Sequence, residues 1–311
     1  MQLSRRQFCQ STLATSAALA TGSSFLPAKS LFAGADTPFR LNYIVASAMY
    51  GKTPLAELVP EIPKTGAEYI EIWAERHGNQ REQIDELGEE AFLELLKENN
   101  VKLGSFTCFK FGIFKMRPEM ELVHRLVGDM VICNTGKPQD DSNLKAEVRK
   151  FAEQLQPHVE FAESLGITIG VENHGGGLIN TPDSIRYLMD FVGSKNLGLA
   201  MAPYHLPQDP ELIANLIQDL DTRLVHFQAW EHGMGCITKL PKEQEMLQLP
   251  HRGPLDWKPI LAALKAINYA GRTEIFMHPV PRGIPILPEV SQVTEEINAA
   301  RKYLEAELAQ V

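Results

Sequence analysis

The chain has 311 residues, of which 44% are hydrophobic and 22% are charged, and its formal net charge at pH 7 is −9. This balance is typical of a globular protein with a full hydrophobic core, in one large α/β domain or two small ones. A protein that binds a phosphate backbone needs the opposite charge, so the composition disfavours nucleic acid as substrate or partner.

The first 35 residues have the pattern of an export signal. The twin-arginine segment Ser4-Arg5-Arg6-Gln7-Phe8 is followed by a small, uncharged stretch, 11–20, and Ala33-Gly34-Ala35 fits an A-x-A cleavage site. The apolar stretch is too short to span a bilayer. We therefore expect residues 1–35 to be a twin-arginine signal peptide, and the mature chain, 36–311, to be periplasmic or secreted without membrane attachment.

The three cysteines of the mature chain are Cys108, Cys133 and Cys236. None has the spacing of a zinc site or of a CxxC redox motif. Cys108 and Cys133 both lie near predicted strand ends, which leaves one bridge open, but the pattern favours two buried free thiols.

The mature sequence repeats one pattern eight times, in which a short apolar strand is followed by a polar loop and then, at most repeats, by helical spacing of apolar residues. The predicted strands are 40–46, 69–73, 102–107, 130–134, the first half of 166–177, 197–202, 224–229 and 273–277. The predicted helices are 54–65, 86–99, 144–165, 182–191, 256–267 and 289–309.

This alternation predicts an α/β protein with parallel strands. Eight units in one chain favour a single (β/α)8 TIM barrel spanning 36–311, and an open doubly wound sheet is the second choice. No strand is followed by a glycine-rich nucleotide-binding motif, which argues against a nucleotide cofactor.

The fifth strand carries the strongest chemical signal. Its aliphatic residues alternate with Thr168, Gly170 and Glu172, so Glu172 lies on the opposite face from the aliphatic row. His174 follows on the same face as Glu172, and a run of glycines comes after it. A carboxylate and an imidazole at the C-terminal end of a barrel strand lie where such barrels keep their active sites.

Other strands end in similar groups, and a barrel would bring them together at one mouth. From the second strand to the eighth, these side chains are Glu71, Glu75, Glu172, His174, His205, His226, Trp230 and His278. Carboxylates with imidazoles suit Mn²⁺, Zn²⁺, Co²⁺ or Fe²⁺ better than Ca²⁺.

Several motifs resemble the xylose isomerase-like TIM barrels, the sugar phosphate isomerase/epimerase family. They are Gly-Val-Glu-Asn-His-Gly-Gly, Ala-Pro-Tyr-His, Leu-Val-His-Phe, Gly-Pro-Leu-Asp-Trp-Lys-Pro-Ile and Tyr269-Ala270-Gly271, in register over about 40–280. The family's epimerases hold a divalent metal with Glu, Asp, His and Glu on strands five to eight, and the two glutamates move the substrate proton.

By this resemblance Glu172 and His226 match two of the four ligands, whereas Ala202 and Phe276 replace the others. Neither Ala nor Phe can bind a metal, so the resemblance implies a rearranged site. We predict Glu172, His226 and His278 as metal ligands and Glu172 and His205 as catalytic groups. The predicted substrate-binding residues are Glu71, His174, Trp230 and Arg282.

The predicted function is therefore sugar or keto-sugar isomerisation or epimerisation by proton transfer at a divalent metal, in an exported enzyme. Metal-free acid–base chemistry, a non-catalytic sugar-binding barrel, and a lyase or hydrolase on the same scaffold are the alternatives. The expected partner is a small carbohydrate, and a homo-oligomer remains open.

Overall fold

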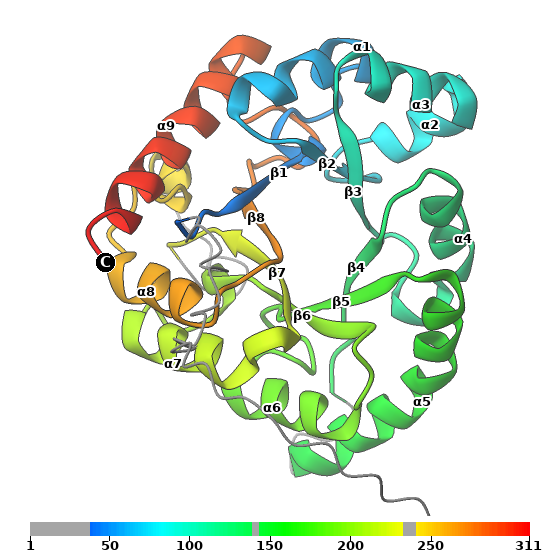
Figure 1. The fold of residues 1–311 in the computed structure, drawn as a ribbon, viewed down its shortest axis with the longest axis vertical. Coiled ribbons are helices and arrows are strands. Elements are labelled where there is room, and N and C mark those ends of the chain that lie inside the picture. Colours follow the sequence, from blue (N-terminus) through cyan, green and yellow to red (C-terminus); the bar gives the residue numbers. More distant parts are fainter. Residues whose placement is uncertain (1–37, 139–142, 233–240) are drawn as a thin grey trace, which may run out of the picture. The chain divides into compact units, whose positions relative to one another are not determined.

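A computed structural model describes residues 38–138, 143–232 and 241–311, so the predicted signal peptide and Cys236 lie outside the described residues. Eight parallel strands form a closed barrel in the order β1 to β8, and β8 pairs with β1. Figure 1 shows the helices as an outer ring around these strands. The predicted single (β/α)8 barrel is confirmed.

The strands are β1 (Asn42–Ala46), β2 (Tyr69–Trp73), β3 (Lys102–Thr107), β4 (Met130–Asn134), β5 (Thr168–Glu172), β6 (Leu197–Met201), β7 (Leu224–Ala229) and β8 (Arg272–Ile275). The helices are α1 (Leu55–Leu58), α2 (Gln80–Leu87), α3 (Glu89–Glu98), α4 (Arg117–Arg125), α5 (Leu144–Leu165), α6 (Pro182–Phe191), α7 (Pro210–Leu220), α8 (Lys258–Ala266) and α9 (Val290–Leu308).

Two predicted helices are broken by residues that do not continue an α-helix. The helix expected over 54–65 is α-helical only in α1 and continues as the 3-10 helix η2 (Val59–Thr65), which contains Pro60 and Pro63. Proline has no N–H to donate to the preceding turn. The helix expected over 86–99 is split into α2 and α3 at Gly88, whose φ of 90° and ψ of 149° are not helical.

Two other helix predictions, 144–165 and 182–191, agree with the structure. α5 covers the predicted range and buries Val148, Phe151, Leu155 and Val159 along one face. α6 begins at the predicted Pro182, and Thr181 forms a capping box with Ser184. The spacing of apolar residues and the capping chemistry therefore determine these elements locally.

The N-terminal end of the barrel is closed by a charged pair. The Arg272 guanidinium donates to both carboxylate oxygens of Asp129 at 2.6 Å and to the Gly104 carbonyl at 3.1 Å. It also lies over the Tyr69 ring, 4.3 Å from the ring centre. Met130, Ile132 and Ala200 form an apolar cluster of their own, distinct from the main core. Side chains therefore fill the barrel interior from this end upward.

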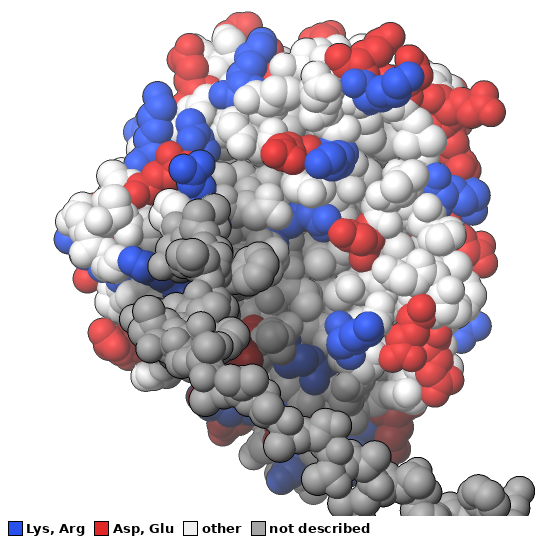
Figure 2. Space-filling model, in the orientation of Figure 1, with Lys and Arg blue, Asp and Glu red and all other residues white. Residues whose placement is uncertain are grey.

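The surface carries both signs of charge. Figure 2 shows Lys and Arg interspersed with Asp and Glu on the visible face. None of the helices that the structure describes is both long and apolar enough to cross a bilayer. Cys108 and Cys133 are buried and free, as the sequence favoured.

Candidate functional site

Six rings surround the C-terminal mouth of the barrel, one each from the loops after β2, β3, β5, β6, β7 and β8. In order they are His77, Phe109, His174, His205, Trp230 and His278, which we call the rim rings. Successive centroids lie 6.3, 6.1, 4.3, 5.0, 5.1 and 4.6 Å apart, and the last distance closes the circle from His278 back to His77. Four of the six are imidazoles, so the mouth is rich in nitrogen donors.

Inside this rim, Glu172, His174 and His205 form what we call the mouth cluster. One potential ligand atom from each lies within 4.8 Å of the others. His205 Nε2 is 3.5 Å from Glu172 Oε1. The Nδ1 of His174 donates to the Gly175 carbonyl at 3.0 Å, which leaves its Nε2 lone pair available. These atoms converge because β5 and β6 are neighbouring parallel strands.

Burial sets the protonation of the mouth cluster. It raises the pKa of Glu172 to about 7, although His174, His226 and Gln228 act in the opposite direction. Burial and then the Arg282 charge lower the pKa of His205 to about 3. Burial also lowers the pKa of His174, against the effect of Glu172. At neutral pH the imidazoles are uncharged, and the carboxyl is balanced between its two forms.

A second group, the deep cluster, lies in the barrel interior and consists of Glu71, His226 and Glu274. All three are fully buried, and one ligand atom from each lies within 4.8 Å of the others. His226 Nε2 is 3.3 Å from Glu274 Oε2 and 3.7 Å from Glu71 Oε2. The Thr107 hydroxyl donates to Glu71 Oε1. Burial raises the pKa of both carboxyls, to about 8 for Glu274.

Gln228 connects the two clusters. It pairs with Glu274 in the β7–β8 register and is fully buried. Its side-chain amide is close enough to Glu172 and to Glu274 to lower the pKa of each. The clusters are therefore neighbouring layers of a single polar interior.

Aromatic side chains separate this interior from solvent. Phe276 stacks on Trp73 with centroids 5.2 Å apart and planes 14° apart. Trp230 stacks on Tyr204 at 3.8 Å and meets the Phe276 ring edge-on. Trp73, Phe276 and Trp230 are each at most 2% exposed. These rings form a hydrophobic floor at the mouth.

The structure distributes the predicted metal ligands differently from the sequence expectation. Glu172 belongs to the mouth cluster, His226 to the deep cluster, and His278 to neither of the ligand groups found among the described residues. The His278 ring instead packs edge-on against Trp73, Phe276 and Trp230 and stacks on His77. These three therefore do not form a single ligand set.

The remaining predicted residues lie at or below the mouth. His205 and His174 lie beside Glu172. Glu71 lies one layer deeper. The Trp230 indole donates to Gln248 and has one face covered by Tyr204. Arg282 is exposed, and its charge lowers the pKa of His77, His205 and His278. Their roles in substrate binding stay predictions.

Sequence reasoning missed His77, Phe109 and Glu274. Glu274 was detectable, because Arg272, Glu274 and Phe276 alternate along β8 and share one face. His77 and Phe109 lie in loops whose course no periodicity predicts.

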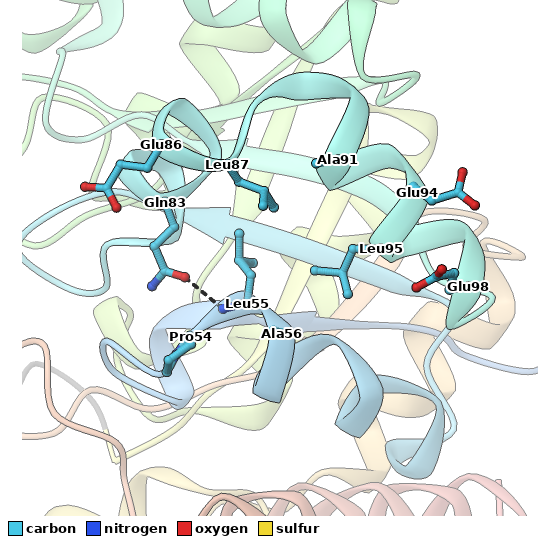
Figure 3. Close-up of a pocket in the computed structure, with 10 residues that line it drawn as sticks. All are labelled: Pro54, Leu55, Ala56, Gln83, Glu86, Leu87, Ala91, Glu94, Leu95 and Glu98. Atoms are coloured by element: carbon cyan, nitrogen blue, oxygen red, sulfur yellow. Dashed lines mark hydrogen bonds between the residues drawn. The ribbon is translucent and has the colours of Figure 1, made fainter.

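A groove on the outer shell is separate from the mouth. It lies between α1 on one side and α2 and α3 on the other, and Figure 3 shows Leu55, Leu87 and Leu95 converging in it while Glu86 and Glu94 point outward. Gln83 Oε1 accepts from the Leu55 N–H at 2.8 Å across it. Its lining is mostly apolar with an acidic rim of Glu86, Glu94 and Glu98.

Together, the closed parallel barrel and a carboxylate–imidazole cluster at the C-terminal strand ends define an α/β-barrel protein of the kind that hosts enzyme active sites at its mouth. The family model of the xylose isomerase-like TIM barrel matches residues 59–303. The chain belongs to this family.

Solved structures share the fold at low sequence identity. D-Psicose 3-epimerase from Clostridium cellulolyticum H10, solved with D-tagatose, has a TM-score of 0.66 and 16% identity over 86% of this chain and 99% of its own. The IolI protein with a bound zinc atom has a TM-score of 0.67 and 18% identity, over 87% and 99%. D-Allulose 3-epimerase from Methylomonas sp. gives 0.65 and 17%, over 87% and 99%. No curated protein matches in a comparison of sequences.

The sequence resemblance places two of the family's metal ligands at Ala202 and Phe276, and neither side chain is a donor. Ala202 is fully buried without a donor side chain, and Phe276 is packed into the aromatic floor. A divalent cation does fit the mouth cluster, because a carboxylate and two neutral imidazoles are suitable ligands for Zn²⁺, Mn²⁺ or Fe²⁺. Glu172 Oε2 has no hydrogen-bond partner among the described residues and is available for such a cation.

Proposed function

We propose that the protein is an exported isomerase of a small carbohydrate, in which Glu172 transfers a proton between neighbouring carbons. A divalent cation held by Glu172, His174 and His205 would supply charge stabilisation at a substrate oxygen. The observation that carries the proposal is the mouth cluster itself, a buried carboxyl between two neutral imidazoles at the ends of β5 and β6.

The protonation of Glu172 suits this work. In the metal-free protein burial raises the pKa of Glu172 to about 7, so this carboxyl both accepts and returns a proton near neutral pH. A carboxyl whose pKa is raised by burial is a frequent feature of active sites. The floor of aromatic rings excludes water from the same space, which protects a reactive intermediate from protonation by solvent.

A site with a single base, Glu172, favours isomerisation over epimerisation. Exchange between an aldose and a ketose returns the proton on the face from which it was removed, so a single carboxylate is sufficient. Inversion at one carbon needs a second group on the opposite face. Phe276 stands where the family resemblance places that second carboxylate, so we propose aldose–ketose isomerisation rather than epimerisation. A one-base elimination, the lyase alternative, is compatible with the same argument.

The localisation proposal depends on the sequence of residues 1–35. The twin-arginine segment and the A-x-A site support export to the periplasm or beyond. Fractionation of the native host with an antibody to the mature chain tests it, and a cytoplasmic, uncleaved protein would contradict it.

The test of the reaction is hydrogen exchange. The mature protein is loaded with Mn²⁺ and incubated in D₂O with a panel of aldoses and ketoses, and deuterium next to the carbonyl is read by NMR. We expect incorporation that falls by about 10²–10⁴-fold in Glu172→Gln, the usual contribution of a general base. His124→Ala, an exposed imidazole of α4, is the matched control and should leave the rate unchanged.

One observation favours the non-catalytic alternative. Glu172 is only 1% exposed, and the aromatic floor lies across the mouth. Calorimetry on the same panel separates the two functions. Sugar binding without deuterium incorporation would replace the isomerase proposal with a sugar-binding barrel.

A further inference from the structure

The described side chains around the deep cluster do not supply enough positive charge to balance its two carboxyls. No Lys or Arg within the described ranges forms a salt bridge with Glu71 or Glu274, and their ion-pair contacts are with His226. The nearest guanidinium on the same strand, Arg272, is already bound to both oxygens of Asp129. Two buried carboxyls thus face one imidazole.

Several polar atoms of this layer have no hydrogen-bond partner among the described residues. They are Glu71 Oε2, Glu274 Oε1 and His226 Nδ1. A buried polar atom without a partner costs about 1–3 kcal/mol, and a charged one costs more. Atoms of this kind do not usually gather in a folded interior, so the arrangement points to a positively charged occupant.

We propose that the deep cluster is a cation site in which the Glu71 and Glu274 carboxylates and the His226 imidazole bind a first-row divalent ion. Two carboxylates and one imidazole are a donor set for Mn²⁺, Fe²⁺ or Zn²⁺. The fully buried Gln228 lies in register with Glu274 at the same layer. The site is distinct from the mouth cluster, with which it shares no residue.

Because the deep cluster is fully buried, we assign its ion a structural role. All three ligands are fully buried, whereas His174 in the mouth cluster is partly exposed. An ion in the deep cluster joins β2, β7 and β8 across the barrel, and binding that requires the folded site stabilises the fold. We expect this ion to exchange slowly and the mouth ion to be removed readily by a chelator.

The experiment counts ions per chain. Untagged mature protein is produced in Mn²⁺-supplemented medium, and total divalent metal is measured by mass spectrometry before and after dialysis against EDTA under native conditions. We expect two equivalents before dialysis and one after it. Glu274→Gln and Glu71→Gln should each lose the EDTA-resistant equivalent, His174→Ala should lose the labile one, and His124→Ala should keep both.

A thermal measurement covers the case in which a deep variant fails to fold. The double variant His174→Ala/His205→Ala leaves the deep cluster intact, so this variant should retain one metal equivalent. The ion is then removed under denaturing conditions and omitted on refolding. We expect the refolded, metal-free variant to have a lower melting temperature. Retention of no metal by this double variant would overturn the deep site. The deep site would also be overturned if the parent binds a single equivalent and Glu274→Gln keeps it. A proton shared by the two carboxyls would then explain the cluster.

The outcome is independent of the proposed reaction. If hydrogen exchange fails while one EDTA-resistant equivalent is present, the isomerase proposal falls and the deep site stands. If exchange occurs and no resistant equivalent is found, the deep site alone is overturned.

Discussion

The closed end of the barrel and the layer above it both contain buried or half-buried charges, but they treat them in opposite ways. At the closed end, Arg272 and Asp129 form two charge-assisted hydrogen bonds of 2.6 Å, and Arg272 also binds the Gly104 carbonyl. In the deep cluster, Glu71 and Glu274 share one imidazole and retain unpartnered oxygens among the described residues. Matched charges support the fold, whereas unmatched ones mark a place for a ligand or a proton.

This contrast predicts opposite effects of removing one charge from each region. Arg272→Ala should lower the free energy of unfolding by about 2–4 kcal/mol, since it removes a bidentate pair, a carbonyl contact and the packing on Tyr69. Glu274→Gln should leave the metal-free protein equally or more stable, because it removes a carboxylate whose ionised form is costly to bury. Urea unfolding of both variants after removal of metal measures the difference.

The matched control for size is Arg272→Met, which keeps much of the stem and loses the charge. It should lie between the parent and Arg272→Ala. A destabilisation of metal-free Glu274→Gln as large as that of Arg272→Ala would show that the deep cluster is a matched network after all.

The fold was predictable because the repeated alternation of apolar strands and helical spacing is local information. α5 and α6 were predicted at their observed ends, since apolar spacing and capping residues act over a few positions. No bounds were assigned to α4 and α7, although proline at the first turns of both was a usable signal. The break at Gly88 depends on a backbone conformation that the composition of the segment does not reveal.

The site was predictable only in part, because register neighbours in a tilted barrel do not lie at the same height. Glu172 pairs with Ala200, Ala200 with His226, and His226 with Arg272. This ladder descends from the mouth cluster to the charged pair at the closed end. Glu172 and His226 therefore belong to different layers, because Glu172 is the last residue of β5 whereas His226 lies in the middle of β7. His205 approaches Glu172 because its loop folds back as a 3-10 turn, Pro203–His205.

The pH dependence of the free energy of unfolding gives a smaller effect that tests the same comparison. Burial raises the pKa of Glu172 to about 7 and of Glu274 to about 8 in the metal-free protein, whereas an unfolded glutamate titrates at about 4.3. Between these values the folded state retains protons that the unfolded chain releases, so stability falls as pH rises. The rim histidines act in the other direction, because partial or full burial, helped by the Arg282 charge, lowers the pKa of His77 to about 4 and that of His205 to about 3. Their contribution falls as pH decreases below about 6.5.

Above about pH 7 the unfolded imidazoles have released most of their protons and the raised carboxyls dominate, so the free energy of unfolding should decrease from pH 7 to 8 by about 1 kcal/mol per pH unit for each retained proton. Glu274→Gln should flatten this decrease. Added Mn²⁺ should also flatten it, since the ion replaces the protons. The Arg272–Asp129 pair should contribute no slope in this range. Stability that rises over the window would contradict the assignment of protonated carboxyls to the deep cluster.

The smallest effect concerns Arg282, the exposed cation at the rim. Its charge contributes to the low pKa of His77, His205 and His278, so it acts on the space inside the rim rings. Arg282 donates to the Pro279 carbonyl at 3.3 Å. Arg282→Gln should weaken binding of a sugar acid or sugar phosphate by about 5–10-fold at low salt and leave neutral sugars unchanged, as expected for one exposed charge. It should also raise the pKa of His77 in an NMR titration, because a nearby positive charge is removed. Equal losses for neutral and anionic sugars would show that Arg282 shapes the loop after β8 rather than contacting an anion.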